Sequence, residues 1–188
     1  LDGWNPDTGE HLWRRYTIPA PGEKGGDTWP NNGAYLHGGA STWITGSYDP
    51  ELDLMYWGTG NAAPYNPAIR PGDNLYTASI LAVRPKTGEI VWHYQATPND
   101  IYDWDAVWEV ILGEIKIDGK EYAIPFTSSK VTLKRANPTT IERTLTGQDG
   151  TETATWTLSA DGKTLTIVAK GADPTGVAYT STQVFDKK

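Results

Sequence analysis

The chain has 188 residues, a formal net charge of −7 at pH 7 and no cysteine, which excludes disulfides and thiolate metal sites. No basic stretch is long enough to follow a phosphate backbone, so nucleic acid is not an expected partner. No apolar run approaches the roughly 18 residues of a membrane-spanning helix, and neither such a span nor a signal peptide is visible.

The first predicted elements are strand–turn–strand units that repeat one pattern. Residues 5–13, Asn-Pro-Asp-Thr-Gly-Glu-His-Leu-Trp, match residues 84–92, Arg-Pro-Lys-Thr-Gly-Glu-Ile-Val-Trp, and residues 48–57 form a further unit between them. Units therefore recur about every 35–45 residues, a spacing typical of four-stranded propeller blades. In both copies Thr-Gly predicts a turn, and the following Trp predicts a ring packed between neighbouring sheets. An ordinary hairpin repeated by chance is the alternative, which the shared spacing disfavours.

Longer stretches accompany this repeat, at residues 25–30 (Gly-Gly-Asp-Thr-Trp-Pro), 38–43 (Gly-Gly-Ala-Ser-Thr-Trp), 56–67 (Tyr-Trp-Gly-Thr-Gly-Asn-Ala-Ala-Pro-Tyr-Asn-Pro) and 70–77 (Arg-Pro-Gly-Asp-Asn-Leu-Tyr-Thr). With the repeat, they make residues 1–112 resemble the pyrroloquinoline quinone (PQQ) alcohol and methanol dehydrogenases. The resemblance implies a closed β-propeller that holds PQQ on its axis beside Ca²⁺ or a lanthanide ion and oxidises a small primary alcohol. It also implies a periplasmic or secreted location.

The resemblance places the quinone beside residues 41–43. Trp43 matches the tryptophan whose indole forms the floor under the quinone, and Ser41 and Thr42 are the adjoining cofactor-binding residues. An indole offers a large π face for stacking, and Gly38-Gly39 favours a backbone close to a ligand. The residues by themselves leave open a tryptophan packed between blades, because residues 1–112 hold eight of the nine Trp.

The resemblance assigns the ion and the proton transfer to three further residues. Asn61 matches an amide ligand of the ion, whereas its alternative is a cap of the tight turn at residues 58–61. Asp103 matches the catalytic base, which takes the alcohol proton while hydride moves to the quinone. Asp105 matches the extra aspartate of lanthanide-type members. In an extended segment, residues two apart project the same way, so both carboxylates are expected to meet one ion; a solvated turn is the alternative.

Other parts of that family's site have no match here. Its glutamate ligand lies upstream of Leu1, its arginine and later blades are expected after residue 112, and about two to three blades are present. The chain starts within the pattern and without Met, which predicts a processed, truncated or internal start. We therefore expect a truncated relative without dehydrogenase activity on its own, whose open sheet edges pair with a second copy.

Residues 113–188 have a different composition, with fifteen Thr, one Trp, ten basic and nine acidic residues. Alternation of apolar or β-branched with polar residues predicts strands at 130–135, 140–145, 153–158, 164–169 and 177–185. Residues 115–117 and 121–124 predict a hairpin around Asp118-Gly119, and further turns are predicted at Asn137-Pro138, Asp149-Gly150, Asp161-Gly162 and Asp173-Pro174. The pattern predicts an antiparallel meander that forms a partial barrel or a sandwich.

Residues 117–122, 159–166 and 184–188 resemble small uncharacterised bacterial secreted β-proteins with a lipocalin-like meander. This implies a chimeric chain, either natural or a product of cloning environmental DNA, with a partial propeller at 1–112 and a meander at 113–188. The fold is predicted to be all-β, with antiparallel propeller-blade-like sheets followed by the meander. Two alternative functions stay open: a module that binds a small, lipid-like ligand, and an oligomerising interaction protein.

Overall fold

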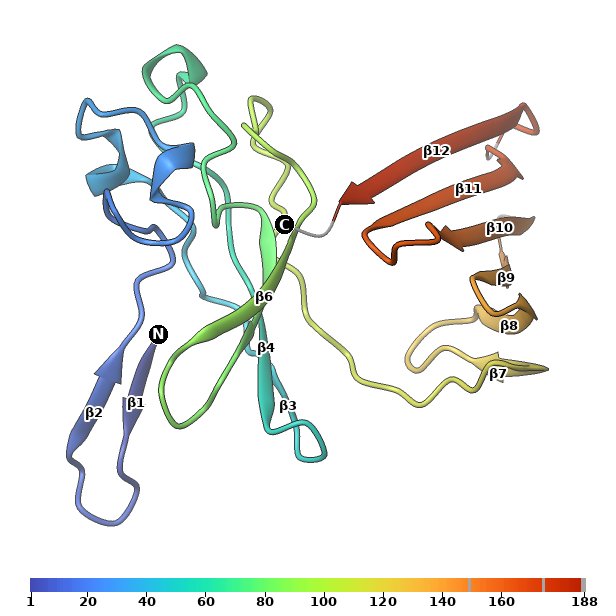
Figure 1. The fold of residues 1–188 in the computed structure, drawn as a ribbon, viewed down its shortest axis with the longest axis horizontal. Coiled ribbons are helices and arrows are strands. Elements are labelled where there is room, and N and C mark those ends of the chain that lie inside the picture. Colours follow the sequence, from blue (N-terminus) through green and yellow to red (C-terminus); the bar gives the residue numbers. More distant parts are fainter. Residues whose placement is uncertain (149, 174, 187–188) are drawn as a thin grey trace. The chain divides into compact units, whose positions relative to one another are not determined.

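The computed structural model describes residues 1–148, 150–173 and 175–186. Asp149 and Pro174, which belong to two predicted turns, and the terminal Lys187 and Lys188 lie outside the described residues. The chain divides into two compact units, Leu1–Leu112 and Gly113–Lys188 (Figure 1). The described residues form strands and short 3₁₀ helices, so the all-β prediction is confirmed. In this described part, no helix is long and apolar enough to cross a membrane.

The first unit contains two antiparallel sheets. Strands β1 (Asp2–Trp4) and β2 (His11–Arg14) form a two-stranded ribbon. The second sheet has four strands in chain order, as a propeller blade does: β3 (Ser47–Asp49), β4 (Leu54–Gly58), β5 (Ser79–Val83) and β6 (Ile90–Gln95). The long connections carry three 3₁₀ helices: η1 (Gly26–Thr28), η2 (Ala34–His37) and η3 (Pro67–Ile69).

The repeated Thr-Gly…Trp pattern has a structural explanation. The indole Nε1 of Trp13, from the first copy, donates to the carbonyl oxygen of Pro85 in the second copy at 2.8 Å. The same ring covers Gly88, where an added Cβ would collide with it. Gly88 has φ +69°, so glycine is favoured there both by the turn and by the ring. The tryptophan of one copy therefore docks on the turn of the other.

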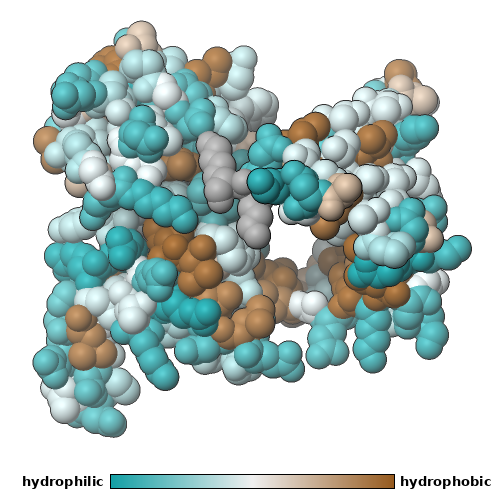
Figure 2. All heavy atoms as spheres, in the orientation of Figure 1, coloured by the Kyte–Doolittle hydropathy of each residue, from teal (hydrophilic) through white to brown (hydrophobic). Residues whose placement is uncertain are grey.

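The core of the first unit lies on both faces of β5. Leu81 and Val83 are fully buried with Leu75 and Tyr76 on one side, whereas Ala82 packs with Leu54 and Tyr56 on the other. Because successive strand residues point to opposite faces, this burial pattern marks β5 as a strand covered on both sides. Figure 2 shows apolar residues gathered over the region of β4 and β6.

The second unit is one six-stranded antiparallel meander with its strands in chain order: β7 (Asp118–Ala123), β8 (Lys130–Asn137), β9 (Thr140–Gly147), β10 (Gly150–Leu158), β11 (Thr164–Ala172) and β12 (Ala178–Asp186). The sheet is open, with β7 and β12 at its edges. Its register aligns Trp156 with Ile141 and Ile167, so these apolar side chains share one face.

The hairpin predicted around Asp118-Gly119 is wrong. Both residues begin β7, which pairs with β8, and the register shifts between Asp118 and Glu121. The carboxylate of Asp118 accepts a hydrogen bond from the backbone N–H of Lys120 at 3.0 Å, and Gly119 has φ +75°. The Asp-Gly pair therefore makes a bulge within a strand, because Asx bonding and a positive φ serve a bulge as well as a turn.

Candidate functional site

A cavity of about 230 Å³ in the first unit collects most of the predicted site residues. Its walls include Ser41, Trp43, Asn61, Asp103 and Asp105. Thr42 lies outside this lining, and its carbonyl oxygen accepts a hydrogen bond from the indole of Trp57 at 3.3 Å. Segments far apart in the chain thus meet in one place, because the lining comes from the loops that precede β3, follow β4 and follow β6.

Backbone pairing brings the Ser41–Trp43 segment beside Asn61. The N–H of Ala40 donates to the carbonyl of Asn61, and the N–H of Gly60 donates to the carbonyl of Ser41, both at 2.9 Å. Gly39 forms an isolated antiparallel bridge with Ala62, and a Cβ on Gly39 would collide with the Asn61 carbonyl. The predicted close approach at Gly39 is therefore made to another backbone segment.

Asn61 connects the two aspartates. Its Nδ2 donates to the carboxylate of Asp103 and, at 3.0 Å, to that of Asp105. Its Oδ1 accepts from the backbone N–H of Ala106 at 3.2 Å. One amide thus holds two carboxylates against their mutual repulsion, and both residues line the cavity.

The two aspartates converge for a different reason from the predicted one. Asp103 has φ +58° and Asp105 has φ +51°, so neither lies in extended backbone. Asp tolerates this left-handed conformation better than most residues. The backbone turns at both aspartates, and these two turns direct their carboxylates toward Asn61.

A buried network that the sequence reasoning missed holds two walls of the cavity together. Arg70 is only 1% exposed. Its Nε donates to the carbonyl of Pro64 at 2.7 Å, and its Nη2 donates to the carbonyl of Asp100 at 2.5 Å. Pro64 precedes the cavity residue Tyr65, and Asp100 begins the loop that carries Asp103. One guanidinium therefore links both segments.

The side chain of Asp100 extends this network into the loop. It is 3% exposed, and its carboxylate accepts hydrogen bonds from the backbone N–H groups of Tyr102 at 2.9 Å and Trp104 at 3.3 Å. Burial lowers the pKa of Arg70, while the charge of Asp100 opposes this shift. No sequence pattern identified either role, because an Arg in a Pro/Gly-rich stretch is equally compatible with an exposed turn.

Tyr65 is a second cavity residue that was missed. A hydrogen bond to Asp103, followed by the negative charge of that residue, raises the pKa of the Tyr65 phenol. The hydroxyl therefore stays protonated and donates to the carboxylate. Tyr65 and Trp43 are 70% and 68% exposed, so both rings offer a free face at the mouth of the cavity.

The donor atoms are of the type that a hard cation prefers, but they are fewer than such an ion needs. Carboxylate and amide oxygens are the ligands that Ca²⁺ and similar ions prefer, and Ca²⁺ takes about six to eight of them. Asp103 and Asp105 supply carboxylates, and Asn61 supplies an amide whose oxygen would have to replace its nitrogen on the cation side. Within the described ranges, no group of three or more His, Cys, Asp or Glu residues is arranged so that it could hold a metal ion.

Comparisons with known proteins point to one family. The family model described as "PQQ: Glucose/ethanol/alcohol dehydrogenase, beta-propeller domain" matches residues 1–133. The match continues beyond residue 112, where the composition changes, through β7 and into β8. Residues 113–133 therefore group with the dehydrogenase part by sequence.

Individual proteins agree with this match. The quinohemoprotein alcohol dehydrogenase ADH IIB of Pseudomonas putida is 44% identical over 133 residues, which cover 64% of this chain and 19% of that protein. The quinoprotein alcohol dehydrogenase PedH of the same species is 40% identical over 146 residues, covering 69% and 24%. A solved europium-containing methanol dehydrogenase aligns with a TM-score of 0.57 at 28% identity, over 98% of this chain and 29% of its own. The chain thus spans about a fifth to a quarter of the curated relatives.

Proposed function

The chain belongs to the PQQ-dependent glucose/ethanol/alcohol dehydrogenase β-propeller family, and from this membership we propose that the cavity beside Trp43 is a quinone and metal site for alcohol oxidation. One observation carries the proposal: Trp43, Asn61, Asp103 and Asp105 line a single cavity. Scattered placement of these side chains over separate surfaces would have left no such site.

Each residue has a role that its geometry supports. Trp43 presents an exposed indole on which a planar ring stacks, next to Ser41. Thr42 supports that segment through its carbonyl bond to Trp57. Asp103 accepts the hydroxyl proton of an alcohol, and Tyr65 orients its carboxylate. PQQ stacked on Trp43 would supply a hydride acceptor, and an ion held by Asn61, Asp103 and Asp105 would supply Lewis-acid polarisation.

Asp105 supports a trivalent ion over Ca²⁺. It contributes a second carboxylate at the same amide as Asp103, and a higher ligand charge favours the more highly charged ion. The europium-containing methanol dehydrogenase is among the structures that this chain resembles. We therefore infer that this chain binds lanthanides more tightly than Ca²⁺.

We do not expect this chain alone to oxidise alcohols. The cavity provides two carboxylates and one amide for an ion that needs more oxygen ligands, and the rings at its mouth are exposed. Water therefore reaches the reacting centre, which weakens the electrostatic effect of the ion. We expect ion binding without oxidation of methanol or ethanol.

Two measurements test ion binding and alcohol oxidation separately. Tb³⁺ luminescence excited through tryptophan should report a saturable site, and dye reduction with PQQ, Ce³⁺ and ethanol should stay at the blank rate. Turnover above the blank would refute the inactive fragment. Absence of saturable Tb³⁺ binding would refute the metal site itself.

The segment that could come from a second protein is shorter than residues 113–188. The family match ends at residue 133 within β8, so a separate, lipocalin-like origin is proposed only for β9–β12. The solved europium-containing methanol dehydrogenase aligns over 98% of this chain, so a common origin of β9–β12 with the other strands is the competing hypothesis. Hydrogen exchange tests the independence of this segment: amides of β9–β12 and of β5 should open at different denaturant concentrations.

The open sheet edges support a second candidate role, pairing with another copy of the chain. The edge strand β6 exposes Val91, Trp92 and Tyr94 by 37%, 43% and 39%. An exposed edge with large apolar side chains favours strand addition. Light scattering after size-exclusion chromatography should then detect a dimer or larger species, whereas a monomer at every concentration contradicts this role.

A further inference from the structure

The turns of the first repeat (residues 5–13) and the second repeat (residues 84–92) are built alike but differ in what covers them. The N–H of Gly9, at φ +71°, donates to the carbonyl of Asn5 at 2.8 Å. The N–H of Gly88, at φ +69°, donates to the carbonyl of Arg84 at 2.9 Å. The indole of Trp13 covers Gly88, whereas a Cβ added at Gly9 would meet nothing within 4 Å in the described part of the chain. The first turn therefore has the conformation that binds a tryptophan in the second repeat, but its surface is exposed.

The two tryptophans of the repeats differ in the same way. The indole N–H of Trp13 donates to the carbonyl of Pro85, whereas that of Trp92 has no acceptor among the residues that the structure describes. Trp92 is 43% exposed, and its ring contacts Tyr56 at a centroid distance of 5.8 Å. The first unit therefore presents one exposed docking turn and one exposed docking tryptophan.

This turn and this tryptophan belong to opposite sides of the four-stranded sheet. Leu1, beside the β1–β2 ribbon that carries the turn, packs against Leu81 and Val83 on one face of β5. Trp92 pairs with Ala82, whose side chain points to the other face. Complementary surfaces on opposite sides of a molecule favour head-to-tail association, in which each molecule uses both surfaces.

We propose that Trp92 of one molecule docks on the turn at residues 5–9 of a second molecule of this chain. The contact within the chain supplies its geometry. The indole ring lies over Gly9, and its N–H donates to the carbonyl of Pro6, which is the equivalent of Pro85 in the first repeat.

The residues around this contact set its strength. Strand β6 carries no acidic residue, so Asp7 and Glu10 of the turn meet no like charge on that strand. Within the chain, Arg15 adds a second hydrogen bond, from its Nε to the carbonyl of Gly88 at 2.7 Å. Tyr94 takes the equivalent position in the second repeat and has no guanidinium. We therefore expect the contact between molecules to be weaker than the one within the chain and to dissociate on dilution.

Tryptophan docking differs from the addition of strands to β6 and does not involve the quinone site. Strand addition uses backbone groups of β6 and leaves the turn at residues 5–9 untouched. A substitution at Gly9 therefore distinguishes the two modes of association. The cavity beside Trp43 can bind an ion, or fail to bind one, in either case.

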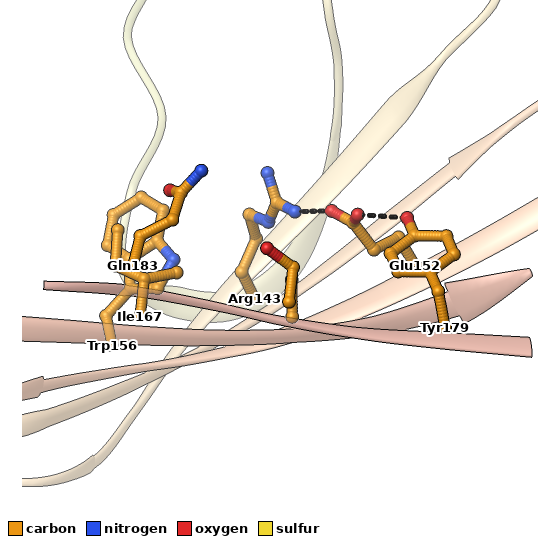
Figure 3. A pocket seen from close by; sticks show the side chains of 8 residues that line it. Arg143, Glu152, Trp156, Ile167, Tyr179 and Gln183 are labelled. Atoms are coloured by element: carbon orange, nitrogen blue, oxygen red, sulfur yellow. Dashed lines mark hydrogen bonds and ion pairs between the residues drawn. The ribbon is translucent and has the colours of Figure 1, made fainter. Parts of the chain in front are cut away.

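The second unit provides matched controls for both docking surfaces. Its one tryptophan, Trp156, lines a cavity of about 350 Å³ between neighbouring strands of the six-stranded sheet, and Figure 3 shows it beside Gln183. Gly162 has φ +70°, and a Cβ added there would have no neighbour within 4 Å among the described residues, as at Gly9. Trp156→Thr and Gly162→Asn therefore repeat the changes made at Trp92 and Gly9, but outside the docking surfaces.

Sedimentation velocity of the full chain over a wide range of concentrations tests the proposal. We expect the mass of the unmodified chain to rise with concentration, and the two control variants to behave in the same way. Gly9→Asn should weaken association at least about tenfold, because Asn tolerates the left-handed conformation and its side chain takes the place of the indole. Trp92→Thr should weaken it by a similar factor, and Thr suits the exposed strand position.

Mixing the two docking variants tests the head-to-tail arrangement. The Gly9→Asn chain keeps its tryptophan and the Trp92→Thr chain keeps its turn, so an equimolar mixture should form a one-to-one complex where each variant alone is monomeric. An unmodified chain that stays monomeric at every concentration, or a mixture of folded variants that stays monomeric, overturns the proposal. Association that survives Gly9→Asn also overturns it, even if Trp92→Thr does not fold, and is the result that strand addition to β6 would give.

Discussion

The two units build their cavities in different ways. In the first unit, the walls are loop segments from distant parts of the chain, and a buried guanidinium and one amide hold them together. In the second unit, the walls are neighbouring strands, and the register alone sets which side chains meet. A loop-built site therefore depends on a few buried polar residues, whereas a sheet-built site depends on side-chain size along each row.

The largest expected effect comes from removing the guanidinium of the first unit. Arg70→Met leaves the carbonyls of Pro64 and Asp100 without their donor and the Asp100 carboxylate without a nearby positive charge. We expect a loss of about 2–5 kcal/mol in the free energy of unfolding, measured by urea denaturation, because each buried acceptor left unpaired costs roughly 1–3 kcal/mol.

The control for this variant is Arg14→Met. Arg14 forms an exposed ion pair with Asp2, with 53% of its side chain accessible. Its loss should change the urea midpoint little, because exposed ion pairs contribute little to stability. Equal costs for Arg70→Met and Arg14→Met would show that the buried network does not hold the loops.

The two copies of the repeat provide the next contrast. Gly88→Ala puts a Cβ into the ring of Trp13 at φ +69°, and Gly9→Ala puts one into open space at φ +71°. Both variants carry the strain of a left-handed alanine, about 1–2 kcal/mol. Gly88→Ala should cost a further ~1–3 kcal/mol for overpacking, and thermal unfolding should resolve the difference.

A smaller effect is expected on ion binding. Asp105→Asn removes one of two carboxylates from the cavity and should weaken Tb³⁺ binding at least about tenfold. Glu109→Gln removes an equal charge from an exposed residue of the same segment, outside the cavity lining, and should change it little. If both variants weaken binding equally, the effect is one of net charge and not of a site.

The smallest effect concerns pH. The hydrogen bond to Asp103 raises the pKa of Tyr65 in the folded chain, so it stabilises the protein while the phenol is protonated. This contribution is present below the unfolded tyrosine pKa of about 10 and disappears as pH rises through the folded value. The stability difference between the unmodified chain and Tyr65→Phe should therefore vanish at high pH. A difference that persists there contradicts the hydrogen bond.

How much the sequence could predict also differs between the two units. Alternation of side chains located most strands of the second unit, because period two is directly visible in residues such as Thr164–Ala169. Turn signals were less specific, as the bulge at Gly119 shows. In the first unit, the resemblance indicated Trp43, Asn61, Asp103 and Asp105, and these line one cavity.

The reasons for this convergence were not readable in the sequence. Positive φ at Asp103 and Asp105 and the burial of Arg70 depend on contacts between distant segments, and no local pattern encodes such contacts. Likewise, the cavity of the second unit depends on a strand register that places Ala154, Ala169 and Ser181 in one row.

The docking of Trp13 on the second repeat also bears on the order in which the chain folds. Its indole reaches Pro85 across 72 residues, so this contact closes a long stretch of chain. Contacts of high sequence separation form late, since their loop entropy must be overcome first. We therefore expect the β1–β2 ribbon to dock only after β5 and β6 have paired, so that Trp13 would report a late step in the folding of the first unit.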